Sequence, residues 1–320
     1  MVLVTGGAGF LGSHLVDRLL SMGLEVIVLD NLFRGSKANL AQHQGNRNFR
    51  FEHGDILDAS TLRKAVKGVD TVFHMAAING TRYFYEQPRR VLEVNGLGTR
   101  NLLQAACDEN VKRVVFASTS EVYGEPRHFP TLEDEPINFD PPLERRWSYA
   151  VSKLFGEHLC FSLNAERKLE TVVLRYFNAY GPRLIGTPYG QVVAIFIRSV
   201  LRGVAPTIHG DGKQTRTFTY VTDSVDATIA AAESEQAVGG VFNIGSGEET
   251  TILDLAEEII EICGRTGELK PIHDDPLPGD SRRRCPDTNK ARQILGFQAE
   301  IGLKYGLEKT VQWFKETGVA

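Results

Sequence analysis

The chain has 320 residues, of which 42% are hydrophobic and 24% charged, as expected for a globular protein with one large core or two coupled ones. Its net charge of −4 argues against binding to nucleic acid or to an anionic membrane. No run approaches the roughly 18 apolar residues of a membrane span. Met1 leads straight into an apolar segment without a charged leader, so we expect a cytoplasmic protein. The four cysteines lie far apart and metal-ligand spacing is absent, so we expect neither disulfides nor a metal site.

Short β-branched runs alternate with helix-length segments over the first half of the chain. The runs are continuously apolar, as in a parallel sheet covered on both faces. The strands predicted from them are Val2–Thr5, Glu25–Asp30, Phe49–His53, Thr71–Ala76, Arg113–Ser118 and Thr171–Phe177. The helices predicted between them are Leu11–Met22, Thr61–Val66, Gly98–Asn110 and Tyr149–Glu166. This alternation predicts an α/β fold with a doubly wound parallel Rossmann sheet.

The pattern loosens after Phe177, where residues 180–189 and 270–286 are rich in Gly or Pro. The later predicted elements are helices at Val192–Arg202, Asp223–Glu233 and Ile252–Cys263 and strands at Thr217–Val221 and Val241–Ile244. We interpret residues 1–177 with about 217–245 as a Rossmann domain. Residues of about 178–216 with 246–320 then form a smaller, interleaved lobe.

The first predicted strand runs directly into Gly7-x-Gly9-x-x-Gly12, and a helix follows. This setting suits a dinucleotide, because glycine lets the backbone approach a pyrophosphate and the helix N-terminus offers free N–H groups. Asp30 ends the second strand, where its carboxylate can accept hydrogen bonds from the adenosine ribose and would repel a 2′-phosphate. The site is therefore predicted to hold NAD. Arg34 close by leaves NADP as the alternative, since an arginine can pair with that phosphate.

Asp55, after the third strand, has two interpretations of equal weight. Its carboxylate can reach the adenine amino group, or it can cap the helix near Ser60.

Tyr149 and Lys153 stand at i and i+4 on one helix face. A fixed cation favours the phenolate, so Lys153 is expected to lower the pKa of Tyr149 and make it a general base. Thr119 ends a strand whose carboxyl end faces the ligand crevice. It is expected to hydrogen-bond the same substrate hydroxyl that Tyr149 deprotonates.

A set of motifs in fixed order spans most of the chain. It consists of T-G-G-A-G-F-L-G at 5–12, Asp30, Gly54-Asp55, His74-Met75-Ala76-Ala77, Asn95-x-x-Gly98-Thr99, S-T-S-E-V-Y-G at 118–124, Tyr149 with Lys153, and Arg175-Tyr176-Phe177-Asn178. The set resembles the extended short-chain dehydrogenase/reductase superfamily, the nucleotide-sugar epimerases, dehydratases and decarboxylases. The resemblance implies a tightly held NAD that is recycled within one turnover, and a transient 4-keto sugar. It also implies a homodimer packed through the helices near Gly98–Asn110 and Tyr149–Glu166.

The resemblance also implies roles for individual positions. The implied cofactor site consists of Gly6, Gly9, Phe10, Leu11, Gly12, Asp30, Asn31, Asp55, Ile56, Ala76, Ala77, Asn95, Ser118, Tyr149, Lys153 and Tyr176. The implied contacts to the sugar or its diphosphate come from Asn178, Arg216, Arg282 and Arg284, and the run 282–284 leaves open which arginine takes part. Arginine forks suit a diphosphate, and although a tri-arginine run is more often a solvated surface patch, the resemblance implies that at least one of its members binds the diphosphate.

The reaction depends on the neighbours of Thr119. Glu121 is similar to the acidic residue of decarboxylases and 4,6-dehydratases, but Ser120 stands where a dehydratase carries an acid. Thr119-Ser120-Glu121, Arg146 and the run 276–287 resemble UDP-glucuronate decarboxylases, in which Arg146 would hold the sugar carboxylate. The first hypothesis is therefore decarboxylation, with a 4-epimerase close behind and a dehydratase third. An ordinary alcohol dehydrogenase with exchanging NAD and a non-catalytic NAD(P) sensor are the remaining alternatives.

Overall fold

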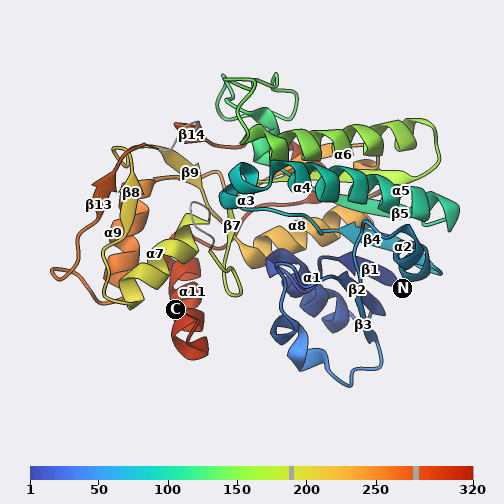
Figure 1. Ribbon diagram of the computed structural model, residues 1–320, viewed down its shortest axis with the longest axis horizontal. Helices are drawn as coiled ribbons and strands as arrows, with labels where there is room; N and C mark the ends of the chain where they lie inside the picture. The colour runs from blue at the N-terminus through green and yellow to red at the C-terminus, as the bar shows by residue number, and fades with distance from the viewer. Residues whose placement is uncertain (187–190, 277–280, 320) are drawn as a thin grey trace.

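The computed structural model describes residues 1–186, 191–276 and 281–319. Within these ranges, seven strands form one parallel sheet in the order β11-β6-β5-β4-β1-β2-β3 (Figure 1). Their bounds are β1 Val2–Thr5, β2 Val26–Asp30, β3 Phe49–His53, β4 Thr71–His74, β5 Arg113–Thr119, β6 Glu170–Tyr176 and β11 Val241–Ile244. The chain thus has the predicted doubly wound Rossmann architecture, in which the strand order reverses between β1 and β4.

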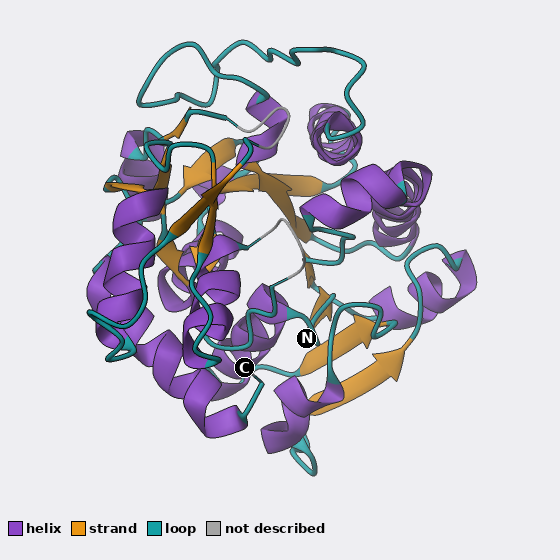
Figure 2. Ribbon diagram, turned by 60° about the vertical axis from the view of Figure 1, so that its left-hand side comes forward, coloured by secondary structure: helices purple, strands orange, loops and turns teal. Residues whose placement is uncertain are grey.

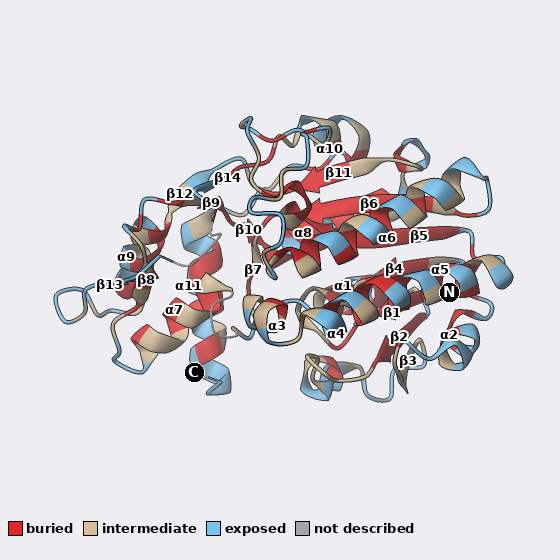
Figure 3. Cartoon of the chain, turned by 45° about the horizontal axis from the view of Figure 1, so that its top comes forward, coloured by how far each residue is buried: buried red, intermediate tan, exposed pale blue. Residues whose placement is uncertain are grey.

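Helices pack on both sides of the strands (Figure 2). One face carries α1 Phe10–Ser21, α8 Val221–Glu233 and α10 Asn289–Leu295. The other face carries α2 Ala59–Val66, α4 Pro88–Leu92, α5 Gly98–Asp108 and α6 Trp147–Ala165. Successive strand residues point to opposite faces, so Val4 and Val28 join the first core while Leu3 and Ile27 join the second. This explains why these strands are apolar throughout and why β5, β6 and β11 are largely buried in Figure 3.

A third apolar core lies at the other end of the molecule, among α7 Val192–Leu201, α9 Ile252–Ile262 and α11 Leu303–Thr317 (Figure 1). Short strands accompany these helices, and their bounds are β7 Ala179–Tyr180, β8 Thr207–His209, β9 Thr215–Thr217, β10 Thr219–Tyr220, β12 Glu249–Thr251, β13 Ile272–Asp274 and β14 Arg283–Arg284. They pair as β10 with β7, β13 with β8, and β12-β9-β14.

The predicted strand Thr217–Val221 is wrong. Thr217 ends β9, Thr219 begins β10, and Val221 already belongs to α8. β9 and β10 pair with different partners, and neither joins the central sheet. A β-branched run reports a preference for extended backbone, but not which strand each residue meets. The two-domain division stays a prediction, with β11 beside β6 in the central sheet.

Other differences lie at element ends and in short segments. The predicted strand Thr71–Ala76 ends at His74, after which Ala76 N donates to the side chain of Thr5 at 3.3 Å. The helices that were not predicted are η1 Lys37–His43, α3 Thr81–Glu86, α4, the π-helical turn η2 Glu93–Leu97, η3 Ser120–Tyr123, η4 Glu235–Ala237, α10 and α11. Residues 187–190 and 277–280, in the two stretches expected to be irregular, lie outside the described residues.

Candidate active site

A cavity of about 1020 Å³ lies at the carboxyl ends of β1, β2, β4 and β5. α7 and β8 line its opposite wall. The crevice beyond the carboxyl ends of the strands, where the strand order reverses, is the ligand site of open parallel sheets.

The glycine-rich turn after β1 forms the floor of this cavity. Gly6 has a φ of 70°, and a Cβ there would lie 2.7 Å from the backbone of Ala76. A Cβ on Gly12 would lie 2.2 Å from the carbonyl oxygen of Gly6. Gly9 caps α1 without a side-chain hydrogen bond, so the first N–H groups of that helix remain available to an anion.

Asp30 is held at the edge of the cavity by two backbone groups. Its Oδ2 accepts from Ala8 N at 3.0 Å and its Oδ1 from Leu32 N at 2.7 Å. Burial raises the pKa of this carboxyl, against the effect of those hydrogen bonds. Each carboxylate oxygen keeps a further lone pair, so the position fits an acceptor for ribose hydroxyls.

Asp55 does not line the cavity. Its carboxylate accepts from Asn31 Nδ2 at 2.8 Å and from Leu57 N at 2.9 Å. The prediction that Asp55 caps the helix near Ser60 is wrong, because Asp58 accepts from Ser60 N at 2.8 Å. Asp58 directly precedes α2, and a side chain in this position can accept from the first free N–H groups of the helix.

Asn95 is the other expected cofactor residue that does not line the cavity. Its side chain bonds both backbone groups of Ile78, at 2.7 and 3.1 Å, and the hydroxyl of Ser152 at 3.2 Å. Asn95 thereby fixes the loop after β4. The remaining expected cofactor residues all line the cavity, namely Gly6, Gly9, Phe10, Leu11, Gly12, Asp30, Asn31, Ile56, Ala76, Ala77, Ser118, Tyr149, Lys153 and Tyr176.

Tyr149 lies near the start of α6, hydrogen-bonded to the side chain of Thr119. The Phe84 ring stacks on it with centroids 4.7 Å apart. Burial, together with the negative charge of Glu121, raises the pKa of the Tyr149 phenol. The expectation of a lowered pKa is therefore wrong for the protein alone, because the sequence does not reveal that the phenol is buried beside a carboxylate.

Lys153, one helical turn on, donates from Nζ to the carbonyl oxygen of Ala117 at 2.7 Å. Burial lowers its pKa to about 7, against the attraction of Glu157. Glu157 is itself held by Arg175, at 2.9 and 2.6 Å, and by the hydroxyl of Ser118. A satisfied ion pair thus supports the helix that carries Tyr149 and Lys153.

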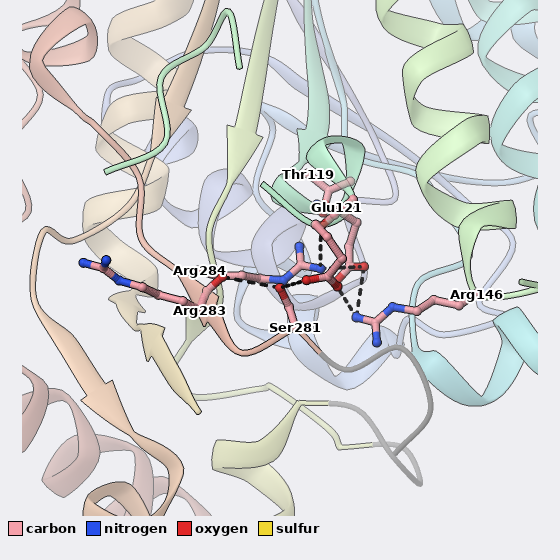
Figure 4. Close-up of polar contacts among 8 residues, drawn as sticks. Thr119, Glu121, Arg146, Ser281, Arg283 and Arg284 are labelled. Carbon is pink, nitrogen blue, oxygen red and sulfur yellow. Dashed lines mark hydrogen bonds and ion pairs between the residues drawn. The ribbon is translucent and has the colours of Figure 1, made fainter. Parts of the chain in front are cut away.

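Glu121 lies in the cavity between the buried Arg284 and the partly buried Arg146 (Figure 4). Arg146 Nη2 and Arg284 Nη2 each approach Glu121 Oε2 at 3.3 Å, from opposite sides in the view. Burial would raise the pKa of this carboxyl, but the charges of Arg284 and Arg146 outweigh it and lower the pKa to about 2. Glu121 is therefore a carboxylate at neutral pH.

The structure separates the three arginines of the run 282–284. Arg284 is buried and lines the cavity. Arg282 is exposed, bonds Asp211 at 2.8 Å, and does not line the cavity. Arg283 bonds Glu249 at 2.9 Å and points away from Glu121 in Figure 4. Neighbouring residues of a short strand face opposite sides, which is why only one of β14's two arginines can enter the site.

The cavity lining is strongly cationic. Among the described residues it includes Arg34, Arg90, Arg146, Arg183, Arg198, Arg202, Arg216 and Arg284, against two carboxylates, Asp30 and Glu121. Asn178 also lines it, and its amide donates to Thr217 O at 3.0 Å. Such a cavity suits ligands with several phosphate charges.

The sequence interpretation did not anticipate four of these arginines as cavity residues: Arg90, Arg183, Arg198 and Arg202. Arg198 and Arg202 have a detectable signal, because their i, i+4 spacing puts them on one face of the α7 segment. Arg90 lies on the five-residue helix α4 and Arg183 in irregular backbone, so neither carries such a pattern. Within the described ranges, no group of three His, Cys, Asp or Glu is arranged to hold a metal ion. In the same ranges, no helix is both long and apolar enough to cross a membrane.

Comparison with known proteins gives the family. The sequence model of the "NAD dependent epimerase/dehydratase family" matches residues 2–245. The chain belongs to this family. Its cofactor is accordingly NAD, and the glycine-rich turn and Asp30 fit that group.

Two relatives and one solved structure cover nearly the whole chain. A UDP-N-acetyl-alpha-D-glucosaminuronate decarboxylase of Bacillus cytotoxicus is 39% identical over 98% of this chain and 97% of its own length. A putative UDP-glucose 4-epimerase of Methanocaldococcus jannaschii is 39% identical over 98% of both chains. The UDP-glucuronic acid 4-epimerase of Bacillus cereus, solved with UDP-glucuronic acid and NAD, superposes with a TM-score of 0.89 at 33% identity over 99% of both chains. The family chemistry is therefore NAD-dependent modification of nucleotide sugars.

Proposed function

We propose that this protein decarboxylates a UDP-linked hexuronate of the UDP-glucuronate type through a transient 4-keto sugar. The observation that carries the proposal is the buried guanidinium of Arg284. It lines the cavity beside Glu121, and among the described residues its Nε and Nη1 atoms have no hydrogen-bond partner. A buried charged donor that lacks a partner is costly, and a second carboxylate would satisfy it.

The charges around Glu121 support an acidic sugar. The guanidinium groups of Arg284, Arg146 and Arg216 all act on this one carboxylate. Thr119, hydrogen-bonded to Tyr149, lies two residues from Glu121, so the sugar hydroxyl to be oxidised and a carboxylate near it would meet this group together. A neutral hexose offers no such anion.

The chemistry follows from these positions. The glycine-rich turn and Asp30 would hold NAD, which would supply hydride transfer to and from C4 and, when oxidised, a positive charge in the cavity. Tyr149 takes the proton of the C4 hydroxyl while Thr119 orients that hydroxyl. Oxidation at C4 makes a β-keto acid, so the C5–C6 bond breaks with its electrons flowing into the C4 carbonyl and CO2 departs. A proton from water then takes the place of the lost carboxylate on C5, and Tyr149 returns its proton to the C4 oxygen as that carbon is reduced.

Lys153 assists by holding this end of α6 in place. Its Nζ anchors the helix to Ala117 of β5, next to Ser118 and Thr119. With a pKa of about 7, it can exchange a proton with the cavity near neutral pH.

Dehydration is the least supported of the three reactions. It requires a base that removes the C5 proton, and a carboxyl with a pKa near 2 is a weak base. It also requires an acid near the departing hydroxyl, where this chain has Ser120. A 4-epimerase of the same uronates needs neither group and is the second candidate, supported by the solved neighbour that holds UDP-glucuronic acid.

The decisive experiment follows product mass. The purified protein is incubated with UDP-glucuronate, UDP-N-acetylglucosaminuronate and, as a neutral control, UDP-glucose. We expect the uronates to lose the mass of CO2, with no net NADH. An unchanged mass with a new isomer would replace decarboxylation by epimerisation, and accumulating NADH would indicate an ordinary dehydrogenase. Turnover by Tyr149→Phe would refute the proposed mechanism itself.

We further propose that the chain forms a homodimer through the surface of α4, η2 and α6. Four large apolar side chains, Leu92, Leu97, Val151 and Phe155, are 40–47% exposed there. Apolar patches of this kind mark protein interfaces. Sedimentation analysis should give a dimer for the native chain and a monomer for Phe155→Glu. A monomeric native protein would contradict this proposal without touching the proposed reaction.

A further inference from the structure

The loop between β2 and η1 packs directly against the glycine-rich turn. A Cβ on Gly35 would lie 2.8 Å from the carbonyl carbon of Ala8, so only glycine allows this approach. Ser36 N and Asn39 Nδ2 both donate to the carbonyl oxygen of Ala8, at 3.0 and 2.9 Å. The loop therefore fixes residue 34 beside the turn that leads into α1.

The side chain of Arg34 extends from this loop into the cavity. Its guanidinium lies 5.6 Å from the ring centroid of Tyr83, and Nη2 is 3.5 Å from Gln191 Oε1, next to α7. Its charge also acts on the phenol of Tyr149. Among the described residues, the buried Nη1 atom has no hydrogen-bond partner.

These contacts of Arg34 lie away from Asp30, the residue expected to bind the adenosine ribose. A 2′-phosphate of NADP would lie next to Asp30. The carboxylate of Asp30 accepts its hydrogen bonds from Ala8 N and Leu32 N, and not from Arg34. The partners of Arg34 instead belong to α3, to the start of α7 and to α6. An arginine directed in this way is poorly placed to distinguish NADP from NAD.

We propose that Arg34 binds the diphosphate of NAD, adding a cation to the N–H groups at the start of α1. The helix N-terminus supplies partial charges and amide donors, and the guanidinium supplies the full charge and the fork that a diphosphate favours. Binding gives the buried Nη1 atom the acceptor that it lacks. The bond to Gln191 ties this contact to the opposite wall of the cavity, which slows release of a cofactor that is recycled in place.

The test measures binding to cofactor-free protein without any sugar, so its outcome is independent of the proposed reaction. Arg34→Met keeps the aliphatic stem and removes the charge, and Arg34→Lys keeps a charge without the fork. Lys37→Met is the matched control, because it removes one charge from the same loop at a residue that does not line the cavity. Calorimetry with NAD, NADP, ADP-ribose and adenosine reports the diphosphate contribution, since adenosine lacks those phosphates.

Arg34→Met should weaken the binding of NAD and of ADP-ribose by at least about tenfold, as expected for the loss of a charged hydrogen bond. The affinity of Arg34→Met for adenosine should differ from the native value by less than about twofold. Lys37→Met should bind all of these ligands as the native protein does. The affinity of Arg34→Lys for NAD should lie between those of Arg34→Met and the native protein. If Arg34→Met weakened the binding of adenosine as much as that of NAD, the proposal would be overturned, because the substitution would then have disturbed the loop as a whole. A loss confined to NADP would overturn it too, by assigning Arg34 to a 2′-phosphate.

Discussion

Two glutamates each meet a buried arginine in this protein, and the two clusters differ in how completely their hydrogen bonds are satisfied. Glu157 is fully buried and accepts two bonds from Arg175, at 2.9 and 2.6 Å, and a third from Ser118. Glu121 meets its two arginines at 3.3 Å and lies in the cavity. Both clusters are charged and contain a buried arginine, so these two properties alone do not distinguish them.

The difference separates a structural ion pair from a binding site. The third nitrogen of Arg175, Nη1, donates to Glu133 O at 2.9 Å, so every nitrogen of this guanidinium has an acceptor. We call such a fully hydrogen-bonded cluster closed. Arg284 keeps two buried nitrogens without partners among the described residues. A closed buried pair stabilises the fold as long as both members are present, whereas an incomplete one costs stability that a ligand can restore.

The largest expected effect comes from opening the closed cluster. Arg175→Met leaves Glu157 as an uncompensated buried charge and should lower the free energy of unfolding by about 3–5 kcal/mol. Urea denaturation followed by circular dichroism measures this. The double variant Arg175→Met/Glu157→Met should recover part of the loss, because neither member of the pair is left without the other. A loss below about 1 kcal/mol for the single variant would mean that the pair is not structural.

The incomplete cluster should respond in the opposite way. Arg284→Met should reduce kcat on the uronate by about 10²–10³, the range seen when one directed charge-stabilising donor is removed. The free energy of unfolding should fall by less than about 1 kcal/mol or even rise, since a buried, incompletely bonded charge is removed. Steady-state kinetics and urea denaturation on the same preparation measure both. A stability loss as large as that of Arg175→Met would remove the distinction between the clusters.

The pH dependence of stability sharpens the comparison further. The pKa of Glu121 is about 2 in the folded protein against an ordinary value of 4.5, so the folded state favours its charged form. Its contribution to stability is fully present above pH 4.5 and is lost as pH falls toward 2. The native protein should therefore lose more stability than Glu121→Gln between about pH 6 and about pH 3.5, by up to about 1.4 kcal/mol per pH unit. Parallel curves from urea denaturation would contradict the lowered pKa.

Sequence spacing was sufficient to predict which residues close together in the chain line the cavity. The glycine-rich turn, Asp30, and Tyr149 with Lys153 are short motifs tied to one strand or helix, and all line the cavity. Spacing was insufficient where segments far apart in the sequence meet. Arg284 reaches Glu121 across 163 positions, and nothing in the run 282–284 reveals which side of β14 each arginine faces. The raised pKa of Tyr149 depends likewise on burial, which only the folded chain creates.

The smallest effect on stability and activity is expected at Arg283, the residue before Arg284. Arg283 and Glu249 are 46% and 23% exposed, so water screens their attraction, and breaking such a pair should cost about 0–1 kcal/mol of unfolding free energy. Because Arg283 points away from Glu121, Arg283→Met should leave kcat/KM within about threefold of the native value (Figure 4). The variant removes the same charge from the same two-residue strand as Arg284→Met. If both variants reduced kcat equally, the strand as a whole, and not the guanidinium beside Glu121, would be responsible, and Arg284 would lose its place in the mechanism.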